Sequence, residues 1–111
     1  MKYIKIYERI NSYDILDSVA YYLEEIIPVS KDEGFKECEY DDSKPPIFSF
    51  YFKDWTDEET YDKFYKFLEN NGLTIYDEKV SKYEIEIFVK IPRNKIIEYA
   101  EIYDTTKKYN L

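Results

Sequence analysis

The stretch IFSFYFK, at residues 47–53, decides how this sequence folds. Phenylalanine takes every second position, at Phe48, Phe50 and Phe52, while isoleucine, serine and tyrosine take the positions between them. Because alternate side chains of a β-strand point to opposite faces, this pattern predicts a strand with one wholly aromatic face. Such a face has to be buried against another layer of the fold.

Four further segments have the pattern of strands. Residues 2–8 alternate isoleucine with tyrosine and lysine, and residues 35–40 follow a glycine. Residues 73–80 and 82–91 indicate a hairpin, whose second arm alternates apolar and charged side chains. The chain therefore has enough predicted strands to surround the aromatic one with neighbours.

Three helices are expected between and after these strands. One runs between Ser12 and Pro28, one covers residues 57–71, and the last runs from Pro92 to about residue 107. Each shows apolar residues at intervals of three and four, which is typical of a helix with one buried side. A Thr56-x-x-Glu59 pattern predicts a capping box at the start of the middle helix.

The resulting order β-α-β-β-α-β-β-α predicts one α+β domain over residues 1–111. Its first six elements match the split β-α-β arrangement of ferredoxin-like domains, an antiparallel sheet with helices on one face. The last strand of the hairpin and the C-terminal helix are then additions to that arrangement.

The net charge of −8 is concentrated in one third of the chain. Residues 32–62 contain eleven acidic and three basic residues, and the 13 acids and 13 bases of the remaining chain cancel. A negative surface attracts basic partners and repels the phosphate backbone of nucleic acids. Direct binding of nucleic acid is therefore not expected.

Several classes of enzyme are excluded by composition. The chain has no histidine, one cysteine (Cys38) and two glycines, Gly34 and Gly72. These counts rule out Ser-His-Asp and Cys-His centres, histidine-bound zinc and glycine-rich phosphate loops. No apolar run approaches the roughly 20 residues that span a bilayer. We therefore expect a non-enzymatic, cytoplasmic protein without cofactor or bound metal.

The acidic segment is predicted to bind a partner, most simply a basic, nucleic-acid-handling protein that it inhibits. Carboxylates can pair with the lysines and arginines that otherwise grip phosphates, and an aromatic side chain can anchor the contact. The predicted partner-binding residues are Asp41, Asp42, Asp54, Asp57, Glu58, Glu59 and Asp62, with Trp55 as the aromatic anchor.

A second interface is predicted on the sheet face opposite the helices. Tyr3, Tyr7, Tyr51 and Phe88 fall on that face in the predicted register, where an antiparallel sheet normally shows polar residues to water. These aromatic residues favour a homodimer in which two sheets pack together or continue edge to edge. The alternative is that the C-terminal helix covers this face within one chain.

Two other functions stay open. Clustered acids, such as Asp41-Asp42, Asp57-Glu58-Glu59 and the acid-x-lysine spacing of Asp77 and Lys79, suit a magnesium- or manganese-dependent nuclease. Aromatic residues on the first and third strands are also typical of RNA-recognition motifs. The acidic charge opposes the second of these functions.

Tyrosine, isoleucine, lysine and glutamate dominate this short chain, whose elements include KYIKIY, FSFYFK, the TDEET helix start and YEIEIFVK. In these features it resembles small proteins of viruses that infect hot-spring archaea. Over residues 1–91 its architecture is similar to the anti-CRISPR family that inhibits type I-D interference. The resemblance implies an acidic, ferredoxin-like homodimer that binds a CRISPR effector subunit in the host cytoplasm. The lack of glutamine also favours a thermophilic source.

Overall fold

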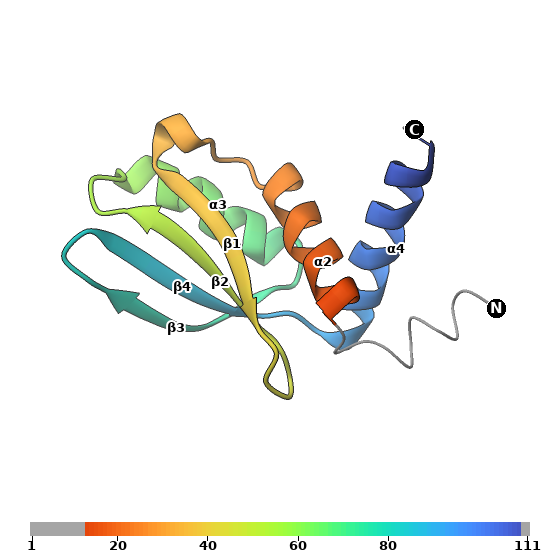
Figure 1. Ribbon diagram of the computed structural model, residues 1–111. Helices are drawn as coiled ribbons and strands as arrows, with labels where there is room; N and C mark the ends of the chain where they lie inside the picture. Colours follow the sequence, from red (N-terminus) through yellow and green to blue (C-terminus); the bar gives the residue numbers. More distant parts are fainter. Residues whose placement is uncertain (1–12, 110–111) are drawn as a thin grey trace.

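The structure, a computed structural model, describes residues 13–109 (Figure 1). The strand predicted at residues 2–8 lies outside the described residues. In chain order the elements are α2 (Tyr13–Ile26), the short 3-10 helix η1 (Lys31–Glu33), β1 (Phe35–Asp41), β2 (Ile47–Lys53), α3 (Glu58–Asn70), β3 (Thr74–Val80), β4 (Glu84–Lys90) and α4 (Arg93–Tyr109).

The four described strands form one antiparallel sheet in the order β1-β2-β4-β3. Since β2 and β3 both run antiparallel to β4, they are parallel to each other with β4 between them. Helix α3 joins them, so β2-α3-β3 is a split β-α-β unit. This confirms the predicted α+β class and the ferredoxin-like, split β-α-β sheet.

One strand takes a place that the sequence did not predict. Strand β4, expected as an additional strand of the hairpin, is a central strand of the sheet. In the register with β2, its Ile85, Ile87 and Val89 lie opposite Phe52, Phe50 and Phe48, respectively. Pairing these two strands joins their most apolar sides into one continuous surface, which explains why β4 lies beside β2.

Helices α2 and α3 lie on one face of the sheet, as predicted, and α4 lies beyond α2 (Figure 1). Phe64 of α3 packs on Phe50 and Phe52 with ring centroids 5.0 Å apart, and α2 packs along β1. Helix α4 packs against α2, where the Tyr22 and Tyr99 rings are 5.2 Å apart. The alternative in which the C-terminal helix covers the opposite sheet face is therefore wrong.

The start of α3 also differs from the prediction. Asp57 is the N-cap: its backbone is extended and its carboxylate accepts the N–H of Thr60 at 2.9 Å. Thr56 is buried against the backbone of Gly34. The predicted capping box of Thr56 and Glu59 is wrong, because packing of the threonine moves the cap one residue along the chain.

Candidate functional site

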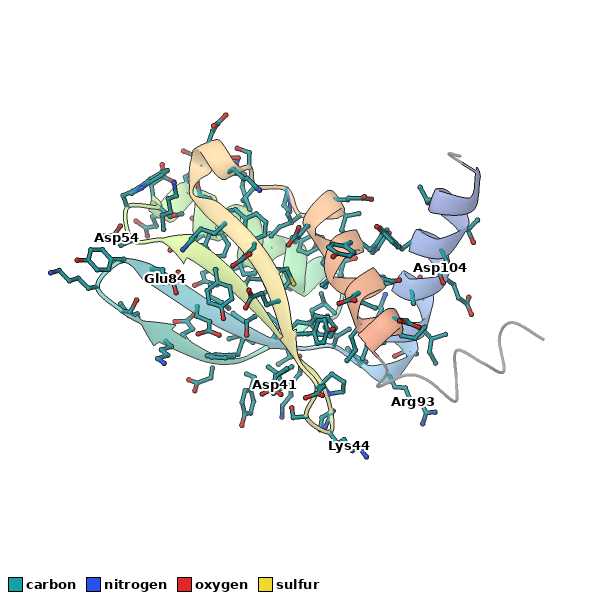
Figure 2. The ribbon with its side chains drawn as sticks, in the orientation of Figure 1. Asp41, Lys44, Asp54, Glu84, Arg93 and Asp104 are labelled. Carbon is teal, nitrogen blue, oxygen red and sulfur yellow. The ribbon has the colours of Figure 1, made fainter. Side chains whose placement is uncertain are left out.

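The predicted partner-binding carboxylates fall into two groups at opposite ends of β2 (Figure 2). Asp41 and Asp42 lie where β1 ends and the loop to β2 begins, and Asp41 accepts the N–H of Ser43 at 3.1 Å. Asp54 and the acids after it lie beyond the other end. The seven residues of β2 separate the groups by about 20 Å. The structure therefore does not bring the seven carboxylates onto one surface.

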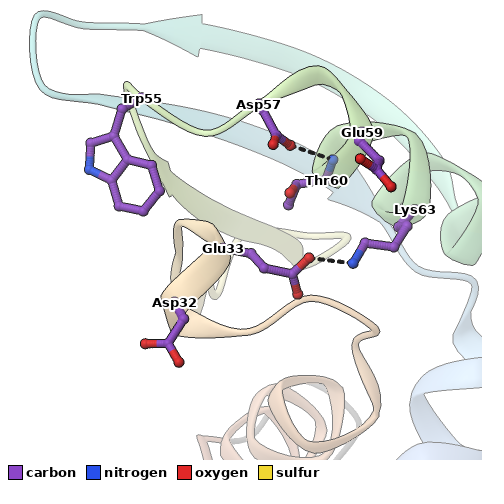
Figure 3. A pocket seen from close by; sticks show the side chains of 7 residues that line it. All are labelled: Asp32, Glu33, Trp55, Asp57, Glu59, Thr60 and Lys63. Atoms are coloured by element: carbon purple, nitrogen blue, oxygen red, sulfur yellow. Dashed lines mark hydrogen bonds and ion pairs between the residues drawn. The ribbon is translucent and has the colours of Figure 1, made fainter.

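The second group borders a pocket of about 280 Å³ between η1 and the start of α3 (Figure 3). We call it the acidic pocket. The Trp55 indole stands at one side of it, and the remaining side chains are polar or charged. The lining residues are Asp32, Glu33, Trp55, Asp57, Glu59, Thr60 and Lys63. Four of them are acidic and one is basic, so the pocket is negative.

Two acids of the pocket already have structural partners. The Asp57 carboxylate caps α3, and the N–H of Thr60 lowers the pKa of Asp57. Glu33 forms an ion pair with Lys63, which lowers the pKa of Glu33 and raises that of Lys63. The Glu33–Lys63 pair joins η1 to α3 across the pocket.

The other acids of this region lie outside these ion pairs and hydrogen bonds. Asp32 and Glu59 in the pocket, and Asp54 and Glu58 beside it, are exposed, and their carboxylates make no hydrogen bond or ion pair with the side chains described for residues 14–106. Asp62 is likewise exposed, one turn further along α3. Exposed carboxylates that lie outside the ion pairs are available to cations from outside.

Exposed apolar side chains gather at the same end of the sheet. Val80, Tyr83 and Trp55 are 74%, 72% and 57% exposed, the highest values for large apolar side chains in the described chain. The N–H of Asp54 donates to the Tyr83 carbonyl at 3.2 Å, which ties the β2–α3 loop to the β3–β4 hairpin. We call this end, residues 31–34, 54–63 and 79–83, the pocket end.

Sequence reasoning found part of the pocket end and missed the rest. It selected Trp55 and the acids after β2, but not Lys63 or the hairpin residues Val80 and Tyr83. The alternation of residues 82–91 places Tyr83 on the same side as Ile85, so the pattern favours a buried strand residue. Its place in a hairpin turn at the sheet end makes it exposed.

The sheet face opposite the helices is less apolar than predicted. Tyr51 and Phe88 lie on it and are half-buried, while Tyr3 and Tyr7 fall outside the described residues. The Tyr51 hydroxyl donates to Glu86 at 2.9 Å, and burial together with this contact raises the pKa of Tyr51. This carboxylate beside the aromatic platform disfavours stacking of RNA bases there.

Further charges cover the same face. Glu37 and Glu39 of β1 are exposed on it, and Lys36 pairs with Glu84 at 2.6 Å. Such a mixture is the usual solvated side of an antiparallel sheet. The homodimer stays a prediction, but the most exposed apolar side chains lie at the pocket end and not on this face.

Both outer strands carry features that oppose edge-to-edge pairing. The N–H of Cys38 in β1 donates to Glu24 of α2 at 2.9 Å, and that of Glu78 in β3 donates to Asp77 at 2.8 Å. Each strand also has a register irregularity, after Phe35 in β1 and after Ile75 in β3. Occupied amides and bulges are common protection for sheet edges. A dimer that continues the sheet is therefore disfavoured.

The carboxylates do not form a compact metal centre. Among residues 13–109, no group of three or more Asp, Glu or Cys side chains is placed to hold a metal ion. Asp77 caps its neighbour's amide, and Glu78 accepts from the Tyr65 hydroxyl at 3.1 Å. The geometry of these residues gives the nuclease hypothesis no support.

Cys38 is 5% exposed, and burial raises the pKa of its thiol well above the usual value. Because the thiolate is the reactive form, we expect a thiol reagent to modify the native protein at least about 100-fold more slowly than the denatured protein. Absorbance of the released chromophore measures both rates. Fast modification of the native protein would place this cysteine at the surface.

None of the helices in the described part is long and apolar enough to cross a membrane. Comparison with protein-family models, curated proteins and solved structures found no match to this chain.

Proposed function

We propose that this protein is a non-enzymatic inhibitor or adaptor that binds a basic, nucleic-acid-handling protein through the pocket end. One observation carries the proposal: an exposed tryptophan stands beside exposed carboxylates that form no ion pair with the described side chains. Tryptophan is among the commonest side chains to dominate binding energy at protein interfaces. Unpaired carboxylates attract cationic surfaces and set their orientation.

The proposed contact consists of Trp55 with Asp32, Asp54, Glu58 and Glu59. These carboxylates can bind lysine and arginine side chains without first breaking an internal ion pair. A site that pairs with such side chains competes with phosphates for them, so binding blocks the partner's access to nucleic acid.

Asp41 and Asp42 are left out of this contact, which revises the set predicted from the sequence. A partner would have to extend along the whole of β2 to reach them. Asp41 also has a local role, because it accepts a hydrogen bond from the loop that follows it. Asp57 caps α3, so it too is left out as a direct contact.

The class of partner follows from the charge, and the resemblance to type I-D anti-CRISPR proteins suggests one example, a CRISPR effector subunit. That example stays a hypothesis, because it rests on element order and composition. The charge argument holds for any partner with a lysine- and arginine-lined groove.

The experiment compares two variants that lose the same amount of charge. The pocket variant carries Asp32→Asn, Asp54→Asn, Glu58→Gln and Glu59→Gln. The control carries Glu37→Gln, Glu39→Gln, Glu69→Gln and Glu101→Gln, all away from the pocket. Each protein is used to capture partners from a lysate of the source organism, and the captured proteins are identified by mass spectrometry.

We expect the pocket variant to lose at least about tenfold in capture of basic nucleic-acid-binding proteins, because close charge pairs and their steering are removed. The control should capture as the natural sequence does, and high salt should weaken both. Similar melting temperatures would show that folding is intact. Equal capture by the two variants would rule out the pocket end as the contact.

A further inference from the structure

Besides the Glu33–Lys63 ion pair, the pocket end carries opposite charges that do not pair with each other. Lys79 and Lys82, at the β3–β4 hairpin, form no ion pair with the side chains described for residues 14–106. Asp32 and Glu59, in the acidic pocket, form none either. Both sets therefore remain available for a partner of complementary charge.

The two sets belong to surfaces with complementary shape and chemistry. The hairpin projects from the sheet, with Lys79 opposite Glu86 on the open face and the exposed Val80 opposite Ile85 on the helix face. At its turn Lys82 lies 5.3 Å from the centroid of the exposed Tyr83 ring. The pocket is concave and combines its carboxylates with the indole of Trp55. Apolar anchors surrounded by matched charges are characteristic of protein interfaces.

The hairpin lies beside the pocket of its own chain and does not line it. The N–H of Ser81 donates to Glu84 at 2.9 Å, and the Tyr83 carbonyl accepts from Asp54 at 3.2 Å. These bonds fix the hairpin turn in line with the sheet, while the pocket lies on the helix side between η1 and α3. The complementary surface therefore has to come from another molecule.

We propose that this other molecule is a second copy of the chain, in a twofold dimer where each hairpin docks into the partner's acidic pocket. A twofold interface uses the same surface on both copies. That surface must therefore contain both the projecting basic hairpin and the acidic pocket that receives it. The pocket end contains both. Lys79 and Lys82 face the carboxylates of the partner's pocket, and Val80 and Tyr83 pack against its indole.

This interface differs from the dimer predicted on the open sheet face. It needs neither Tyr51 nor Phe88, and it leaves both sheet edges unpaired. It also has a regulatory consequence that goes beyond the proposed function: the dimer fills the pocket that a basic partner requires. The dimer would therefore have to dissociate before the pocket can capture a partner. A high protein concentration, which favours the dimer, would reduce capture.

A charge exchange tests the proposal. The hairpin variant carries Lys79→Glu and Lys82→Glu, and a reversed-pocket variant carries Asp32→Lys and Glu59→Lys. Mass is measured by light scattering after size exclusion, from micromolar to about 1 mM protein, the weak limit of specific association. We expect a dimer for the natural sequence and at least about tenfold weaker association for each variant alone.

An equimolar mixture of the two variants should regain the dimer mass, because each hairpin then meets a pocket of opposite charge. Trp55 is the only tryptophan, so its emission should shift to shorter wavelength in the mixture and in no single variant. A Glu37→Lys, Glu39→Lys control on the open face should dimerise like the natural sequence. A monomeric natural sequence at 1 mM, or a mixture that stays monomeric, would overturn the proposal.

The outcome separates this dimer from the proposed function. The hairpin variant keeps its acidic pocket, so it should capture the basic partner at least as well as the natural sequence. Loss of the dimer with retained capture supports both ideas. A stable, exchangeable dimer in a protein that captures no basic partner would remove the proposed function alone.

Discussion

Replacing Phe52 with alanine is expected to lower the free energy of unfolding by about 3–5 kcal/mol, the usual cost of removing a buried phenylalanine. Phe52 is fully buried on β2. Its ring lies 5.0 Å from that of Phe64, 5.1 Å from Tyr61 and 5.5 Å from Phe35, centroid to centroid. The substitution thus opens a cavity where β1, β2 and α3 meet.

Urea denaturation followed by circular dichroism measures this loss, which is a large part of the roughly 5–15 kcal/mol that holds a domain of this size together. The matched control is Tyr83→Ala, which removes an exposed ring from the neighbouring hairpin and should change stability by less than about 0.5 kcal/mol. Similar losses for both substitutions would mean that Phe52 is not in the core.

The second large effect is expected at Gly34, the residue between η1 and β1. Its φ of 114° lies where a side chain is rarely accommodated, and an added Cβ would lie 1.9 Å from Oγ1 of Thr56. Its carbonyl also accepts the N–H of Lys53 at 2.8 Å, which limits how far the backbone can move. We expect Gly34→Ala to cost about 2–4 kcal/mol from strain and overpacking together.

Gly72→Ala is the matched control, because Gly72 also has positive φ (68°) but an added Cβ would meet no atom within 4 Å. It should cost only about 1 kcal/mol, the strain of the left-handed backbone. Combining Gly34→Ala with Thr56→Ala should recover part of the loss, since the crowded hydroxyl is removed. Strictly additive losses would show that the contact with Thr56 is not the cause.

The secondary structure followed from local patterns because its causes are local. Alternating phenylalanines in residues 47–53 predicted β2, and the glycine at 72 marked the end of α3. The capping residue was missed by one position, because two adjacent residues, Thr56 and Asp57, are both good caps. Which of them caps the helix depends on the packing of Thr56 against a segment 22 residues earlier, which no local pattern records.

The candidate site was predictable only in part. Trp55 and the acids around it are close in sequence, so one loop and one helical turn bring them together. Asp41 and Asp42 are also close in sequence to Asp54, yet a strand lies between them and places them at opposite ends of the sheet. Proximity along a chain implies proximity in space across a turn but not across an extended strand.

The sequence by itself determined the α+β class, the helical face of the sheet and the acidic character of the chain, because periodicity and charge are properties of the residues. Tertiary structure alone decided that β4 is central and that α4 packs on α2. It also placed Val80 and Tyr83 at the same end of the sheet as the acidic pocket. These outcomes depend on which apolar surfaces fit each other best, and that choice is made between segments far apart in the chain.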